Sequence, residues 1–145
     1  MIELKHIEKR FGSNIVLKDV SVAMADRSVT ALVGPSGGGK STLLRCINLL
    51  ELPSAGMVRI GEEQISFGTG HRVATRDIQR LRRQTGMVFQ NFQLFPHRTA
   101  IENVMEGLTV VLKWPVAKAR ERAMSLLEKV GMAEKADAWP ATLSG

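Results

Sequence analysis

Residues 34–41 form a glycine-rich run that fits the pattern G-x-x-x-x-G-K-[ST]. An apolar stretch, Val29–Val33, comes directly before this run, and leucines at helical spacing follow it. A loop between a buried strand and a helix can surround a phosphate with backbone N–H groups, provided that side chains are absent from it. The order therefore predicts an α/β fold that binds a nucleotide, with a buried strand at Val29–Val33.

The residue types of this run predict what each position contacts. Glycines permit positive φ angles and leave room for the phosphates. Lys40 is expected to reach the β- and γ-phosphates, the Ser41 hydroxyl to bind Mg²⁺, and Thr42 to contact the α-phosphate. The loop alone leaves ATPases, GTPases, kinases and helicases open. The predicted nucleotide-binding residues here are Gly34, Pro35, Ser36, Gly37, Gly38, Gly39, Lys40, Ser41 and Thr42.

Composition narrows the class of protein further. Hydrophobic residues make up 44% and charged residues 23% of the chain, which is typical of a folded protein and not of a disordered one. The net charge of +6 suits an anionic ligand. The single cysteine, Cys46, excludes an internal disulfide and favours a reducing compartment. Since the N-terminus lacks the apolar core of a signal peptide and no apolar run could span a bilayer, we expect a cytoplasmic chain.

Hydrophobic periodicity and capping patterns predict the remaining elements. A short edge strand is expected over Ile2, Leu4 and the neighbourhood of Ile7, and further strands at Ile15–Met24, Met57–Ile60 and Met87–Phe89. Helices are expected from Ser41, over Thr75–Gln84, after the capping box of Thr99 and Glu102, and between Pro115 and Gly131. We therefore expect an α/β part over residues 1–92 and a helical part over residues 93–145.

The segment before the helical part carries a family resemblance. Residues 86–104 read GMVFQNFQLFPHRTAIENV, which resembles the Q-loop region of ABC-type ATPases. The resemblance gives Gln90 the catalytic role of the glutamine that approaches Mg²⁺ and the attacking water. Lys9-Arg10-Phe11-Gly12 is similar to the family's A-loop, which places Phe11 against adenine, where the family usually has Tyr. The turn at residues 52–56, LPSAG, also matches the family.

The last three residues match the opening of the family's LSGGQ signature, so the chain is expected to stop inside that motif. They are Leu143, Ser144 and Gly145. The resemblance implies that Ser144 contacts the γ-phosphate of an ATP held by the opposite subunit. Two strings, LLRCINLLE at residues 43–51 and GMVFQNFQLFPH, are most similar to ATP-binding subunits of bacterial polar amino acid importers.

The resemblance implies a fold, a reaction and two cofactors. The fold is an α/β P-loop NTPase, here the N-terminal part of an ABC-type nucleotide-binding domain with an incomplete core. It would contain an antiparallel β subdomain, a partial parallel core sheet and a helical subdomain. The cofactors are ATP and Mg²⁺. The function implied for the full-length dimer is ATP hydrolysis that drives the import of polar amino acids.

The resemblance also implies partners and a location. The subunits would pair head to tail as a homodimer and bind transmembrane permease subunits, near Gln90 and the apolar residues Phe92, Leu94 and Phe95. Membrane contact would occur only through the permease, at the inner face of the plasma membrane. No nucleic acid is expected, because the basic stretch has few aromatics and is typical of a solvated helix face. Its members are Arg72, Arg76, Arg80, Arg82 and Arg83.

In the family, the Walker B aspartate, the catalytic glutamate and the switch histidine all follow the signature. The resemblance therefore implies that this chain alone binds Mg–ATP weakly and hydrolyses it negligibly. Val29–Val33 would lack sheet neighbours and become an exposed edge, so we also expect the chain to aggregate.

Two alternative functions stay open at this point. One is an ABC ATPase outside transport, in DNA repair or translation. The other is a short protein that binds nucleotide without hydrolysing it.

Overall fold

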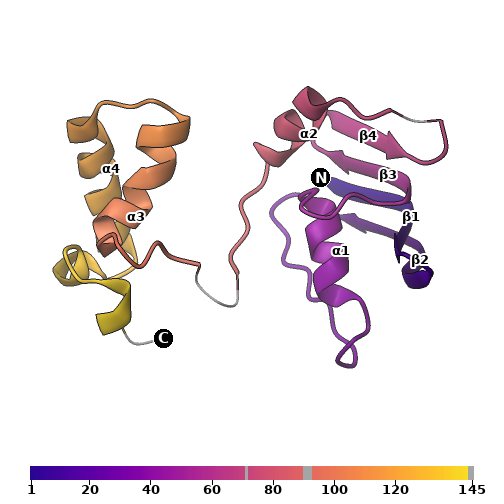
Figure 1. The fold of residues 1–145 in the computed structure, drawn as a ribbon, viewed down its shortest axis with the longest axis horizontal. Coiled ribbons are helices and arrows are strands. Elements are labelled where there is room, and N and C mark those ends of the chain that lie inside the picture. The colour runs from indigo at the N-terminus through magenta and orange to yellow at the C-terminus, as the bar shows by residue number, and fades with distance from the viewer. Residues whose placement is uncertain (71, 90–92, 144–145) are drawn as a thin grey trace. The chain divides into compact units, whose positions relative to one another are not determined.

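We describe a computed structural model that covers residues 1–70, 72–89 and 93–143. The chain divides into two compact units, Met1–Met87 and Val88–Gly145, and each is described by itself (Figure 1). The boundary predicted between residues 92 and 93 stays a prediction, because residues 90–92 lie outside the described residues.

The first unit is built on an antiparallel sheet of four strands in the order β2-β1-β3-β4. The strands are β1 (Ile2–Phe11), β2 (Asn14–Met24), β3 (Ala55–Ile60) and β4 (Glu63–Phe67). A strand forms over Ile2, Leu4 and Ile7 as expected, but the prediction that it is short and lies at the sheet edge was wrong. The strand β1 has ten residues and pairs on both sides, with β2 and with β3.

The strand β4 was not among the sequence predictions. It follows β3 through a two-residue turn at Gly61 and Glu62, where Gly61 has a φ of 59°. Turns of this length favour glycine because their central residues need positive φ. The alternation of apolar Ile65 and Phe67 with polar Gln64 and Ser66 was the available signal in the sequence.

Two helices accompany this sheet, α1 (Lys40–Ile47) and α2 (Thr75–Arg82) (Figure 1). Both contribute to one core, in which Leu43, Cys46 and Leu81 pack with the strand residues Leu4 and Val58. Full burial of a leucine or valine side chain contributes about 1.5–3 kcal/mol. The core therefore holds the N-terminal end of α1, and the glycine-rich loop that leads into it, against the sheet.

The α/β class is confirmed, but the partial parallel core sheet is absent from the described residues. Val29–Val33 forms no strand, and neither does the described segment Met87–Phe89. The side chains of Val29 and Val33 are 99% and 92% exposed. A strand needs a neighbour to satisfy its backbone N–H and C=O groups, and Val29–Val33 pairs with none of the four strands of this sheet. The apolar run therefore stays outside the sheet.

The second unit is helical and consists mainly of α3 (Ala100–Glu106) and α4 (Val116–Lys129). A π-helical turn, η1 (Gly107–Val111), extends α3, and two 3₁₀ turns, η2 (Ala133–Lys135) and η3 (Pro140–Thr142), follow α4. The predicted capping box is confirmed: the Thr99 hydroxyl accepts from the Glu102 N–H, and the Glu102 carboxylate accepts from the Thr99 N–H at 2.8 Å.

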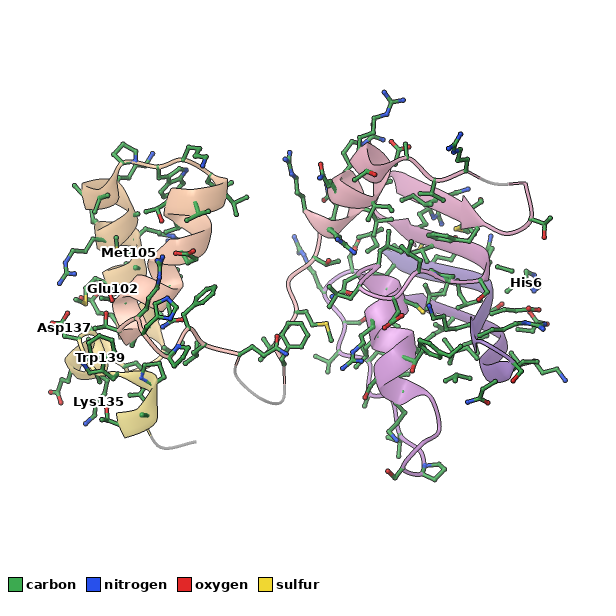
Figure 2. The ribbon with its side chains drawn as sticks, viewed as in Figure 1. His6, Glu102, Met105, Lys135, Asp137 and Trp139 are labelled. Atoms are coloured by element: carbon green, nitrogen blue, oxygen red, sulfur yellow. The ribbon has the colours of Figure 1, made fainter. Side chains whose placement is uncertain are left out.

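Backbone hydrogen bonds fasten the C-terminal turns to α3. Ile101 N–H donates to the carbonyl oxygen of Ala136, and Ala100 N–H to that of Ala138, each at 2.9 Å. Figure 2 labels Glu102 and Met105 on α3, with Lys135 and Asp137 in the turns that follow α4. Within the described residues, no helix combines the length and apolarity that crossing a bilayer requires.

Candidate functional site

The glycine-rich loop has the backbone that a phosphate site requires. Gly37 and Gly39 have φ angles of 79° and 78°, a region that other residues rarely adopt. Gly39 is the N-cap residue of α1, so the first N–H groups of the helix follow the loop directly. Those N–H groups have no acceptor inside a helix and can donate to an anion. The Gly38 N–H donates to the Pro35 carbonyl at 3.2 Å and closes the loop's first turn.

Lys40 points back over this loop. Its ammonium nitrogen donates to the carbonyl oxygens of Gly34 at 3.0 Å and Pro35 at 2.6 Å. The cation is therefore held beside the loop that leads into the N-terminus of α1. A positive charge at a helix N-terminus adds to the attraction of the helix dipole for an anion.

A pocket of about 230 Å³ lies at this loop. Ser41 and Thr42, which were predicted to contact Mg²⁺ and the α-phosphate, are among the residues that line it. Val16 of β2 also lines the pocket, and sequence reasoning missed it. Its strand position gave no signal, because the approach of β2 to Gly39, where Val16 and Leu17 lie close, is a contact between segments distant in the chain. The lining residues are Val16, Ser36, Gly37, Gly38, Gly39, Lys40, Ser41 and Thr42.

Phe11, the predicted adenine contact, is the last residue of β1, and its side chain is 46% exposed. The Lys9 ammonium lies 4.7 Å from the centroid of the Phe11 ring. Lys9 is itself buried and bonds to the Leu52 carbonyl and the Glu51 carboxylate. The ring is therefore accessible to a ligand while its own strand end is fixed.

Two predicted site residues lie outside the described residues. These are Gln90, assigned to catalysis and Mg²⁺, and Ser144 of the signature. Phe92 of the expected permease-docking surface lies outside them too. Leu94 and Phe95 are described and are 42% and 44% exposed, so neither is a fully buried core residue.

Asn103 is a second residue that the sequence analysis missed. Its side-chain oxygen accepts from the Phe95 N–H at 2.8 Å, and its amide nitrogen donates to the carbonyls of Phe95, Arg98 and Thr99 at 3.0–3.2 Å. The amide therefore holds the segment before α3 against that helix. An Asn four residues after an N-cap Thr is a weak signal, since asparagine is common on helix surfaces.

The basic stretch is partly engaged by the protein itself. Arg80 forms an ion pair with Glu63 at 2.6 Å, and Arg82 donates to the Leu49 carbonyl at 2.6 Å. These contacts fit the prediction of a helix surface.

Among the described residues, His, Cys, Asp and Glu form no cluster of three that could hold a metal ion.

The family profile and the similar sequences all point to ABC transporter proteins. A family profile for ABC transporter matches residues 17–145. The chain is 47% identical over its whole length to a probable amino-acid ABC transporter ATP-binding protein of Haemophilus influenzae, of which it covers 56%. It is 46% identical, again over its whole length, to the L-cystine import ATP-binding protein TcyC of Bacillus subtilis, of which it covers 58%. The chain thus spans somewhat more than half the length of the curated relatives it matches.

Solved structures agree with the sequence relatives. The dimeric bacterial ABC transporter cassette MJ0796 superimposes with a TM-score of 0.80 at 33% identity, over 100% of this chain and 64% of the other. The same cassette in a post-hydrolysis state bound to ADP and Pi gives a TM-score of 0.79 at 32% identity, over 99% of this chain and 63% of the other. With the profile matching from β2 to the last residue, the chain belongs to the ABC transporter family.

Proposed function

We propose that this chain supplies the phosphate-binding part of an ATP-binding subunit in an amino acid importer. The main support for this proposal is the structure of the loop formed by residues 34–42. Its positive-φ glycines, the Lys40 ammonium and the N-terminus of α1 all come together at one pocket. This set of groups suits a polyphosphate because backbone N–H groups and one cation can approach it without steric hindrance.

The residues present also fit Mg²⁺ bound through a nucleotide. A magnesium ion typically takes one or two protein oxygens and completes its shell with phosphates and water. The Ser41 hydroxyl is the described candidate for such a ligand. Gln90 is the second proposed contact, to Mg²⁺ and to the attacking water. Bound Mg²⁺ would neutralise phosphate charge, while Lys40 holds the phosphates in place.

The names of the relatives support the importer assignment over DNA repair or translation. Several are described as amino-acid or L-cystine import or transport ATP-binding proteins.

We propose polar amino acids as the solute, permease subunits as the partners and the inner face of the plasma membrane as the location. We further propose that two copies pair head to tail, so that Ser144 of one copy faces the ATP held by the other. The solved relatives are described as dimeric, which supports the pairing of two copies.

The 145-residue chain itself tests the binding step. We expect it to bind Mg–ATP, measured by isothermal titration, and to show no ATP turnover above a Lys40→Ala control. Hydrolysis depends on positioned water as well as bound phosphates, and the proposal assigns this chain only the binding part. Failure to bind Mg–ATP in a folded sample would contradict the proposal. Turnover clearly above the control would show that the chain also holds the catalytic groups.

A further inference from the structure

The most deeply buried charged side chain of the described residues is Lys9, which is 9% exposed. Lysine is almost never buried without a partner, because its ammonium loses hydration. Lys9 has three contacts of different kinds. Its nitrogen donates to the Leu52 carbonyl at 2.8 Å, pairs with the Glu51 carboxylate at 3.0 Å, and lies 4.7 Å from the centroid of the Phe11 ring. The contacts with Leu52 and Glu51 fix the position of the ammonium, and so its position over the Phe11 ring.

The backbone explains why these groups meet. Lys9 and Phe11 are two residues apart on β1, so their side chains leave the same face of the strand. The turn that carries Glu51 is tied to β1 by two hydrogen bonds. Ser54 N–H donates to the Glu8 carbonyl at 2.7 Å, and Arg10 N–H donates to the Ser54 hydroxyl at 3.0 Å.

The same turn follows α1, the helix that begins at the phosphate loop. The ion pair of Lys9 and Glu51 therefore connects the two ends of the nucleotide site. The phosphate loop lies at the start of α1. The segment just after α1 forms the ion pair with the end of β1, which carries Phe11.

We propose that Lys9 is a positioning residue for the nucleotide base. A cation within about 6 Å of a ring centroid is attracted to the ring face, more strongly when it is desolvated. Lys9 thus holds one face of the Phe11 ring and leaves the exposed part of the ring to stack on the base. The cation also draws the ring electrons toward itself, which favours stacking of an electron-rich purine on the other face. This inference rests on the proposed function, and on the family resemblance that places Phe11 against the base.

Two ligands separate base recognition from phosphate binding. Mg–ATP has both parts, whereas Mg–tripolyphosphate has only the phosphates. We expect Lys9→Met to weaken Mg–ATP binding by about 3- to 10-fold, because the base would then have to immobilise the Phe11 ring that Lys9 no longer holds. Affinity for tripolyphosphate should change less than about twofold. Lys9→Arg should restore most of the ATP affinity, because guanidinium also binds ring faces. Lys5→Met, on the same strand and exposed, is the matched control and should leave both affinities unchanged.

A double-mutant cycle gives the decisive comparison. In a Phe11→Leu background, Lys9→Met should have no further effect on ATP affinity if Lys9 acts through the ring. An equal loss of affinity for both ligands, or an undiminished loss in the Phe11→Leu background, would overturn the proposal. If Lys9→Met abolishes cooperative melting, Glu51→Gln takes its place, since it keeps the ammonium and removes its anchor. A loss confined to ATP then supports the proposal, and no loss or an equal loss overturns it.

The unmodified chain separates the two hypotheses. If it binds neither ligand, the proposed function is wrong and this inference is wrong with it. If it binds both, with ATP affinity unchanged in Lys9→Met, only the positioning role is refuted.

Discussion

The ammonium nitrogen of Lys40 lies 2.6 Å from the carbonyl oxygen of Pro35, so the lysine binds back to its own loop. Its second bond, to the Gly34 carbonyl, adds to this closure. An ammonium has three N–H donors, so Lys40 can keep both carbonyls and still donate to a phosphate oxygen. The two carbonyls therefore orient the lysine over its loop, and a side chain held in this way loses less entropy when it binds a ligand.

Lys40→Met should remove ligand binding without unfolding the first unit. The side chain contacts loop carbonyls at the surface, and the core of the first unit does not include it. In a thermal melt we expect the rise in Tm caused by Mg–ATP to disappear, while the Tm without ligand stays within about 2 °C. Lys129→Met, an exposed lysine of the helical unit, removes the same charge and should keep the ATP-induced rise. An ATP response that persists in Lys40→Met would contradict the assigned role.

Gly39→Ala should destabilise the chain more than Gly37→Ala. Both glycines have φ near 78°, so both substitutions cost about 1–2 kcal/mol for the left-handed backbone. A Cβ at Gly37 meets nothing within 4 Å, whereas one at Gly39 would lie 2.9 Å from Leu17 Cδ2 and 3.2 Å from the Val16 carbonyl oxygen. We expect a further loss of about 1 kcal/mol for Gly39→Ala in urea titrations, since crowding a packed site costs energy. Equal losses for the two variants would show that β2 yields freely.

Local signals in the sequence predicted the parts of the fold that local chemistry decides. The capping box of Thr99 and Glu102 forms as expected, because its hydrogen bonds involve residues three apart. The loop before α1 also forms, since its glycines and helix start are neighbours in the chain. In both cases the residues that decide the structure adjoin one another.

Predictions failed where distant segments had to pair. Val29–Val33 has the composition of a buried strand, yet strand formation depends on neighbours that no local pattern supplies. The contact of Val16 with the phosphate loop depends on β2 meeting α1, and the ring contact of Lys9 depends on the turn at Glu51. The sequence marked Phe11 only by resemblance and gave no reason to single out Lys9.

The capping box predicts a pH dependence of the helical unit. Hydrogen bonds from the backbone and hydroxyl of Thr99 lower the pKa of Glu102 below its ordinary value of 4.5. Because this pKa is lower in the folded chain than in the unfolded chain, the stabilisation is fully present above pH 4.5. It is lost as the pH falls through the folded-state pKa. We expect Glu102→Gln to flatten the acid side of the stability curve, measured by urea unfolding at a series of pH values.

Glu121→Gln is the control for that experiment, since Glu121 is an exposed carboxylate of α4. It should leave the acid slope unchanged. If the two substitutions flatten the curve to the same degree, the capping hydrogen bonds do not set the pKa of Glu102.

Cys46 should react slowly with thiol reagents in the folded chain. Burial raises the pKa of its thiol from 9.0 to about 11, while nearby Lys9 lowers it and Glu51 raises it to a smaller extent. The thiolate is the reactive form, so at pH 8 its fraction should be about 100-fold lower than for an ordinary cysteine. We expect reaction with a chromogenic disulfide to be slower than in guanidinium chloride by at least this factor. Rapid labelling under native conditions would show that the core around α1 opens readily.

The exposed valines before the phosphate loop should make the chain self-associate. Val29 and Val33 are almost fully exposed, and their segment has no strand partner among the described residues. An apolar segment with unpaired backbone groups can pair with a second copy. We expect concentration-dependent larger species in sedimentation velocity, and fewer of them for Val29→Thr/Val33→Thr. Threonine keeps the β-branched shape and strand preference of valine, so the change tests apolarity alone. Val130→Thr, at a valine that is 70% exposed in the helical unit, should not reduce association. A chain that sediments as a monomer at all concentrations would refute this prediction.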